Sequence, residues 1–183
     1  EMLRSLVGSE MCIRDRHNAS EKLDYKDYYF VDYTDTDICY KYLDDYFIQL
    51  EKLVEWGNFD SLAHVPYPLR YMMQRDGMDV DMARYQSSID SMLRTLIRRG
   101  QAIEINAGKK PYIMPEYAYL LDRYRALGGK LITVGTDAHS IPQFGMGLKE
   151  AYMLALEKGF ESVAVFKRRK CELVSIRKLL ALE

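Results

Sequence analysis

The residues best suited to chemistry lie at the ends of three short apolar stretches. His64 follows FDSLA, Glu104 and Asn106 lie in AIEIN, and the pair Asp137 and His139 follows LITVG. An Asp-x-His pair can present a carboxylate oxygen and an imidazole nitrogen to one metal ion. This His/Asp mixture suits Zn, Mn or Fe better than Ca or Mg. Polar groups after three successive stretches therefore favour one site over coincidence.

Each of these residues also has a plainer interpretation. A histidine after a strand is usually a turn or rim residue, and Asp-Ala-His alone is compatible with a helix N-cap followed by a surface histidine. Glu104 is equally suited to be a buried carboxylate tied to a lysine, and the segment beginning at Asn106 to form a simple turn. Arg70 and Arg75 would then be ordinary solvated side chains.

The elements that must position these residues are legible from residue 38 onward. Apolar residues recur at helical spacing in five segments: 43–54, 82–97, 117–124, 148–155 and 176–180. The first four are each followed by glycine, which supplies the left-handed residue that turns the chain back after a helix. Short apolar stretches come next: FDSLA, AIEIN, LITVG and SVAVF.

This rhythm predicts a single α/β domain with a buried parallel sheet. In such folds chemistry sits beyond the carboxyl ends of the strands, where the polar residues named above fall. The pattern by itself fits a closed barrel or an open doubly wound sheet. Neither Gly-x-Gly-x-x-Gly nor a P-loop is present, which weakens the nucleotide-binding forms of the open sheet.

The composition is that of a globular domain, with 48% hydrophobic and 29% charged residues and a net charge of -1. The near-zero charge speaks against nucleic-acid or membrane partners held by bulk electrostatics. Residues 1–16 lack the apolar middle part of a secretory signal. Cys12, Cys39 and Cys171 form no Cys-x-x-Cys pair, which suggests reduced thiols in a cytoplasmic protein.

Five segments together resemble a known family. In chain order they are HNASEKLDYKDYYFVDYT, FDSLAHVPYPLRY, AIEINAG, LGGKLITVGTDAHSIPQFGMG and GFESVAVFKRRK. They resemble segments of the histidinol-phosphate phosphatases, which belong to the polymerase-and-histidinol-phosphatase (PHP) superfamily of metal-dependent phosphoesterases. The resemblance implies a distorted (β/α)7 TIM-like barrel with two or three divalent metals (Zn, Mn or Fe). The implied reaction is hydrolysis of L-histidinol phosphate, a small-molecule phosphate ester of histidine biosynthesis.

The resemblance also assigns roles by position. It implies four metal ligands: His17, His64, Asp137 and His139. Close divalent metals lower the pKa of a bridging water and clamp the phosphate oxygens. Asp137 and His139 are the catalytic candidates, since a carboxyl or imidazole nearby can protonate the departing alkoxide of histidinol. Arg70 falls where the family places an arginine near the substrate phosphate.

The sequence departs from the family pattern at two positions, and two further residues are candidates for the site. Ala63 stands where the family more often has glycine, and Thr136 where serine is commoner. Glu104 and Asn106 are candidates for supporting the ligands from behind.

The family also begins with a His-x-His motif, whereas no histidine precedes His17 here. A barrel of this kind runs to about 250 residues, and residues 17–183 number 167 (183 minus 16). The stretch SLVGSEMCIRDR shows no amphipathic period and resembles translated sequencing-adapter sequence. We therefore expect residues 1–16 to be non-native. Residues 17–183 would be a partial PHP phosphoesterase domain without its first strands, with little or no activity by itself.

Two other functions stay open at this point. One is a different PHP-superfamily phosphoesterase that acts on another small phosphate ester or on a nucleotide. The other is a non-catalytic metal-binding domain that has kept the fold.

Overall fold

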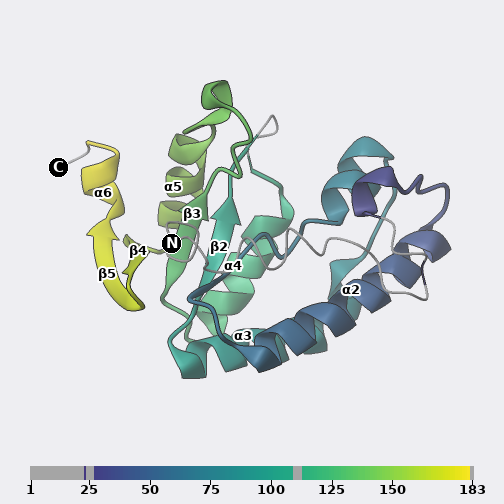
Figure 1. Cartoon of the computed structure of the whole chain (residues 1–183), viewed down its shortest axis with the longest axis horizontal. Coiled ribbons are helices and arrows are strands. Elements are labelled where there is room, and N and C mark those ends of the chain that lie inside the picture. Colours follow the sequence, from purple (N-terminus) through teal and green to yellow (C-terminus); the bar gives the residue numbers. More distant parts are fainter. Residues whose placement is uncertain (1–22, 24–26, 109–112, 182–183) are drawn as a thin grey trace.

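The computed structural model describes residues 23, 27–108 and 113–181 (Figure 1). His17 and residues 1–16, which carry two of the expectations above, lie outside the described residues. The elements in chain order are η3 (Tyr28–Phe30), α2 (Thr36–Trp56), β1 (Ser61–Leu62), η4 (Arg70–Arg75), η5 (Met82–Tyr85), α3 (Gln86–Arg99), β2 (Ala102–Asn106), α4 (Glu116–Ala126), β3 (Ile132–Gly135), η6 (Ile141–Gln143), α5 (Leu148–Glu157), β4 (Ser162–Lys167), β5 (Lys170–Ser175) and α6 (Ile176–Leu179).

A parallel sheet of order β1-β2-β3 lies at the centre of the chain. Ser61 pairs with Ala102, and β2 runs beside β3 from Ile103–Ile132 to Asn106–Gly135. The sequence therefore predicted these three strands and their parallel pairing correctly. Because the strands run in the same direction, their carboxyl ends meet at one edge of the sheet, as the arrows of β2 and β3 show (Figure 1).

The fourth expected strand does not join this sheet. β4 pairs antiparallel with β5 in a separate two-stranded sheet, with Ser162 opposite Ser175. The two strands are joined by Arg168 and Arg169, whose φ angles of 53° and 64° are both left-handed. A two-residue type I′ turn needs positive φ at both positions and is usually signalled by Asn-Gly. Here two arginines hold that place, so the sequence did not reveal the hairpin.

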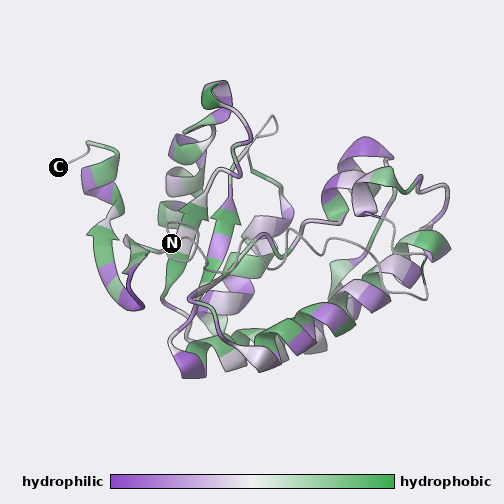
Figure 2. Cartoon of the chain, in the orientation of Figure 1, coloured by the Kyte–Doolittle hydropathy of each residue, from purple (hydrophilic) through white to green (hydrophobic). Residues whose placement is uncertain are grey.

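The long helices end where the sequence indicated, but α2 begins earlier than the apolar segment 43–54 and α3 begins later than the start of the segment 82–97. Asp35 caps α2, its carboxylate accepting from the backbone N–H of Ile38 at 2.9 Å. Gly57 and Gly100 end α2 and α3 with φ angles of 63° and 66°. Polar and apolar stretches alternate along both helices, as expected where one side of a helix is buried (Figure 2). No helix in the described part of the chain is long and apolar enough to cross a membrane.

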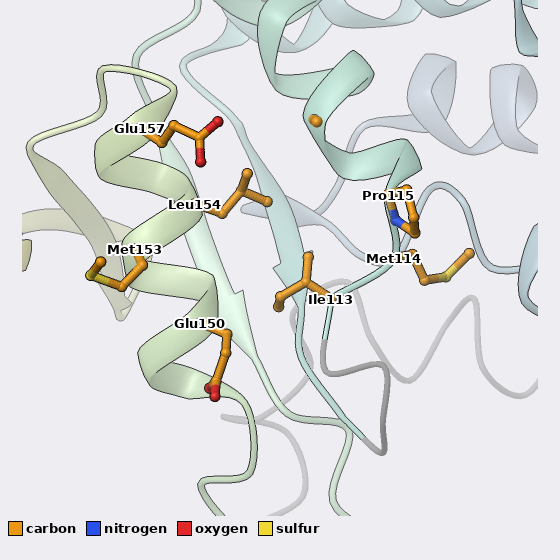
Figure 3. A pocket seen from close by; sticks show the side chains of 8 residues that line it. Ile113, Met114, Pro115, Glu150, Met153, Leu154 and Glu157 are labelled. Atoms are coloured by element: carbon orange, nitrogen blue, oxygen red, sulfur yellow. The ribbon is translucent and has the colours of Figure 1, made fainter.

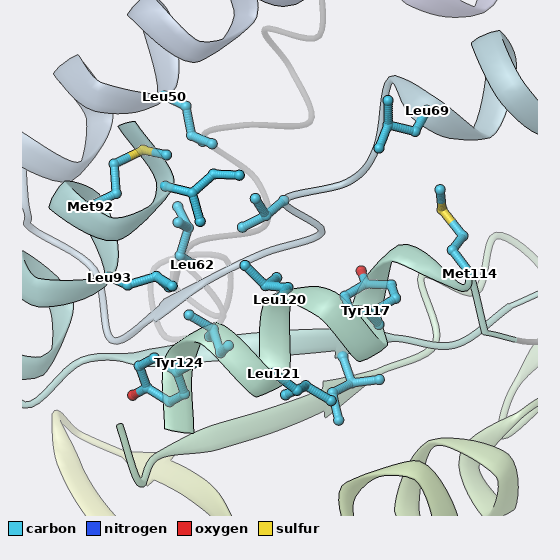
Figure 4. Close-up of a cluster of buried hydrophobic side chains, with 14 of the residues drawn as sticks. Leu50, Leu62, Leu69, Met92, Leu93, Met114, Tyr117, Leu120, Leu121 and Tyr124 are labelled. Carbon is cyan, nitrogen blue, oxygen red and sulfur yellow. The ribbon is translucent and has the colours of Figure 1, made fainter. Parts of the chain in front are cut away.

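The core lies between the sheet and the helices that pack on it. Leu120 of α4 lies close to Leu62 of β1 and Leu93 of α3, and Tyr117 and Leu121 of the same helix belong to the same buried cluster (Figure 4). All five side chains are at most 3% exposed. Burying apolar side chains to this extent stabilises the fold by about 1.5–3 kcal/mol each. This packing fixes the three strands, and thereby the positions of the residues at their carboxyl ends.

Strand β2 presents different chemistry on its two faces. Ile103 and Ile105 are fully buried, and they alternate with Glu104 and Asn106, which are 4% and 2% exposed. Side chains of successive strand residues point to opposite faces of a sheet. The structure thus buries a carboxylate and an amide side by side on one face, at the end where the site was expected.

Candidate metal and phosphate site

The three strands deliver the expected residues to one edge of the sheet. His64 lies two residues after β1, Asn106 ends β2, and Asp137 lies two residues after β3. His64 and Asp137 both have left-handed backbones, with φ angles of 27° and 43°. This conformation is uncommon for residues other than glycine, and such strain clusters at functional sites. It marks the same two strand ends that the sequence singled out.

Asp137 and His139 come together as the sequence predicted. The Asp137 Oδ2 and His139 Nε2 atoms are 3.6 Å apart, and the side chains are 22% and 59% exposed. The backbone N–H of His139 donates to Gln143 Oε1 at 2.8 Å, which fixes the loop after the pair. Two ligands of a tetrahedral zinc with bonds of about 2.0–2.1 Å lie roughly 3.4 Å apart. The pair thus has the donor types and the spacing of two zinc ligands.

His64 lies in a more enclosed place. The residue is 4% exposed, and its backbone N–H donates to Glu104 Oε2 at 2.9 Å. Its ring lies against that of Tyr67, with 5.4 Å between ring centroids. The position of this histidine is therefore set by the neighbouring strand β2 and by the segment that leads to η4.

Arg70, the first residue of η4, reaches the end of β2. Its Nη2 atom donates to Asn106 Oδ1 at 3.4 Å, and Asn106 Nδ2 donates to Glu104 Oε2 at 3.3 Å. Asn106 belongs to the strand, so its interpretation as a simple turn is wrong. The element η4 is a π-helix, a form found often at functional sites. A guanidinium held at this edge is suited to binding a phosphate.

Arg75 is exposed, as the sequence allowed, but its guanidinium is also held by specific partners. Its guanidinium lies 2.6 Å from Asp76 Oδ2 and donates to the backbone oxygens of Tyr29 and Val31. The hydrogen bond between the two side chains raises the pKa of Arg75 and lowers that of Asp76. These contacts tie η4 to η3, and thereby hold the element on which Arg70 lies. Sequence reasoning missed this role, because nothing local to residue 75 signals a partner more than 40 positions away.

A pair of tyrosines, also missed from the sequence, stands beside these residues. The Tyr71 hydroxyl donates to the Tyr67 hydroxyl at 3.1 Å. Burial raises the pKa of both phenols, and the carboxylate of Asp137 adds a smaller rise at Tyr71. Tyr71 thus lies within electrostatic reach of the Asp137–His139 pair. The spacing of four residues between Tyr67 and Tyr71 was the one sequence signal for this contact. It lay in a segment without a regular apolar period.

The described residues do not by themselves assemble a metal-binding group. Among them, no three His, Cys, Asp or Glu side chains come close enough to hold one ion together. Asp137 and His139 are brought together, and His64 is not gathered with them into such a group. His17, the fourth expected ligand, lies outside the described residues.

A pocket of about 420 Å³ lies between the start of α4 and α5 (Figure 3). It is lined by Ile113, Met114, Pro115, Ala118, Glu150, Met153, Leu154 and Glu157. None of the candidate site residues in the described part of the chain lines it.

The chain is similar to three curated proteins. It is 31% identical to a probable histidinol-phosphatase of Thermotoga maritima over 124 residues, 66% of this chain and 50% of that protein. It is 32% identical to a probable histidinol-phosphatase of Clostridium acetobutylicum over 60% of this chain and 43% of the relative. A histidinol-phosphatase of Lactococcus lactis is 30% identical over 67% of this chain and 46% of its own length.

A solved structure is similar as well. It is the histidinol phosphate phosphatase of Lactococcus lactis in complex with zinc, L-histidinol and phosphate. The likeness has a TM-score of 0.60 and 26% identity, and it covers 70% of this chain and 50% of that one. No protein-family model matches the chain. The chain spans about half the length of the curated relatives it matches.

Proposed function

We propose that this chain carries part of a zinc-dependent phosphatase site that hydrolyses L-histidinol phosphate to L-histidinol and phosphate. The observation that carries the proposal is the Asp137–His139 pair, with 3.6 Å between carboxylate oxygen and imidazole nitrogen. It follows a strand whose neighbour ends in Asn106, the residue bonded to Arg70. The three similar phosphatases, and the zinc, histidinol and phosphate in the solved relative, support this choice of metal and substrate.

In this proposal the residues form two groups: a metal arm of His64, Asp137 and His139, and a phosphate arm of Arg70. His64, Asp137 and His139 hold metal, with His17 as a further ligand, and Arg70 binds the phosphate through paired N–H groups. A bound divalent metal supplies a lowered pKa for water and positive charge for the phosphate oxygens. Whichever of Asp137 and His139 takes the proton released by the attacking water would pass it to the departing histidinol oxygen. The partial exposure of both side chains leaves them accessible to a substrate.

We further propose that the sheet β1–β3 belongs to a distorted (β/α)7 barrel of the PHP superfamily. Its consecutive parallel strands with intervening helices support this assignment. We expect the chain alone to turn over poorly, because no three-donor group forms among the described residues.

Zinc binding by the full 183-residue chain tests the proposal. We expect zinc to bind, inorganic phosphate to bind only to the zinc-loaded chain, and His139→Ala to weaken zinc binding by about tenfold or more. Asp122→Asn is the matched control, since it removes a carboxylate that pairs with Lys158 on the exposed side of α4. Zinc affinity that is the same in His139→Ala and the control would overturn the proposal.

Catalysis is measured separately, as phosphate release from L-histidinol phosphate. The phosphatase of Lactococcus lactis serves as the positive control, and a nucleoside monophosphate and glycerol phosphate serve as competing substrates. We expect less than about a hundredth of the control rate. A rate equal to the control would refute the expected low turnover, and a preference for the nucleotide would refute the substrate assignment.

A further inference from the structure

Glu104 lies between the two arms of the candidate site. Its carboxylate is on β2, the middle strand of the parallel sheet, and the residue is 4% exposed. Asn106 lies two residues further on the same face and is 2% exposed. A carboxylate so deeply buried costs free energy unless it accepts several hydrogen bonds. What it bonds to therefore indicates what it is for.

One oxygen of this carboxylate serves both arms. Glu104 Oε2 accepts from the backbone N–H of His64 at 2.9 Å and from Asn106 Nδ2 at 3.3 Å. The first bond satisfies a buried backbone donor next to the left-handed φ of 27° at His64. Bonds to an ionised acceptor are about twice as strong as neutral ones. The carboxylate thus holds the backbone from which the His64 imidazole projects.

The second bond determines how Asn106 faces Arg70. An ionised carboxylate only accepts, so the amide must turn its NH₂ group toward Glu104. The amide oxygen then points away from Glu104 and accepts from Arg70 Nη2 at 3.4 Å. The hydrogen bond to Asn106 anchors one nitrogen of Arg70 and so limits the rotamer freedom of this long side chain. Glu104 therefore sets the orientation of the arginine through one intermediary.

We propose that Glu104 is a positioning residue that couples the metal arm to the phosphate arm of the site. It holds His64 directly and Arg70 through Asn106, so that a ligand bound by one arm meets a preformed partner in the other. This inference rests on the proposed function. It does not require Glu104 to touch metal or substrate.

Three variants of the full chain separate this role from general stability. Glu104→Gln keeps the shape and removes the charge from both hydrogen bonds. Asn106→Ala removes the link to Arg70 and leaves the bond to the His64 backbone. Gln101→Ala is the matched control, a residue 6% exposed at the opposite end of β2, whose amide donates to the backbone oxygen of Gly57 at 2.8 Å.

The readouts are zinc affinity, the affinity of the zinc-loaded chain for inorganic phosphate, and hydrogen exchange of the His64 amide in the zinc-free chain. Glu104→Gln should weaken zinc binding by about tenfold or more and phosphate binding on the order of tenfold, and should speed exchange at His64. Asn106→Ala should weaken phosphate binding alone. Gln101→Ala should change neither affinity more than about twofold.

The outcomes decide between the two levels of proposal. A wild-type chain that binds neither zinc nor phosphate overturns the proposed function, and the positioning role with it. Binding of both ligands with affinities that Glu104→Gln leaves intact overturns the coupling alone. Should Glu104→Gln fail to fold, Asn106→Ala decides. The proposal has Asn106 connect Glu104 to Arg70 and not to His64, so a loss of zinc affinity in Asn106→Ala would contradict it. Unchanged exchange at His64 in folded Glu104→Gln also refutes the coupling.

Discussion

Replacing Asp137 by glycine should leave the zinc-free chain more stable than replacing it by alanine, and both replacements should weaken zinc binding. The φ angle of Asp137 is 43°, in a region where a side chain is strained and glycine is not. This strained residue lies after β3, where its carboxylate contacts the imidazole of His139. The comparison that isolates the backbone is Asp137→Gly against Asp137→Ala, because both variants lose the same carboxylate.

The expected difference follows from two opposing costs. A left-handed backbone costs a residue with a Cβ atom about 1–2 kcal/mol. Glycine loses about 0.5–1 kcal/mol relative to alanine through the larger entropy of its unfolded chain. Asp137→Gly should therefore exceed Asp137→Ala in free energy of unfolding by roughly 0.5–1 kcal/mol, which is about 1–4 °C in melting temperature for a chain of this size. At an ordinary helix or strand position the sign is the opposite.

Urea unfolding with a zinc chelator present measures the difference, and zinc titration measures the functional cost. Both Asp137 variants should lose about tenfold or more in zinc affinity. Arg168 is the control position, since its φ of 53° lies in the β4–β5 hairpin, outside the candidate site. Arg168→Gly should likewise be more stable than Arg168→Ala, with zinc affinity unchanged. Asp137→Ala proving more stable than Asp137→Gly would refute the argument from backbone strain.

Three further predictions concern the scaffold. Gly57→Ala should destabilise the chain in urea unfolding, because φ is 63° and a Cβ there would overlap the Arg99 guanidinium. Gly77→Ala, with φ 68° and open space around it, is the control that retains only the net strain of roughly 0.5–1 kcal/mol. Gly57→Ala should cost more than this control, and an equal or smaller cost would contradict the clash with Arg99. In a Cys12→Ser chain, the exposed Cys171 should react quickly with a thiol reagent. The buried Cys39, whose pKa is raised by burial to about 11, should react only as the chain unfolds. Equal reaction rates at the two cysteines would contradict this prediction. Burial raises the pKa of Tyr124 from 10.0 to about 12. The stability contributed by its neutral hydroxyl should therefore be complete below pH 10 and lost as the pH rises toward 12. In an alkaline titration followed by circular dichroism, a Tyr124→Phe chain should lose less stability than the wild-type chain.

Features that depend on neighbouring residues could be predicted from the sequence. The helices were marked by apolar periodicity and by glycines in left-handed conformation at their ends. Three strands were marked by short apolar runs after those glycines, and their parallel pairing followed from the helices between them. Asp137 and His139 are two residues apart, so the strand end that precedes them sufficed to bring both to one place.

Other features depend on residues distant in sequence, and only the tertiary structure decided them. Whether β4 joined the parallel sheet or paired with β5 depended on a turn that two arginines form without the usual Asn-Gly signal. The anchoring of η4 by Arg75 reaches back to η3 across more than 40 residues.

The same division holds within the candidate site. The sequence placed Glu104 and Asn106 at a strand end by their types and positions, and the family resemblance placed Arg70 near the substrate phosphate. Only packing determined that Glu104 faces the His64 backbone, 40 residues earlier, and that Asn106 faces Arg70. The physical reason is that periodicity fixes which face of an element is buried. The partner of a buried polar group is chosen by whatever segment packing brings within hydrogen-bonding distance.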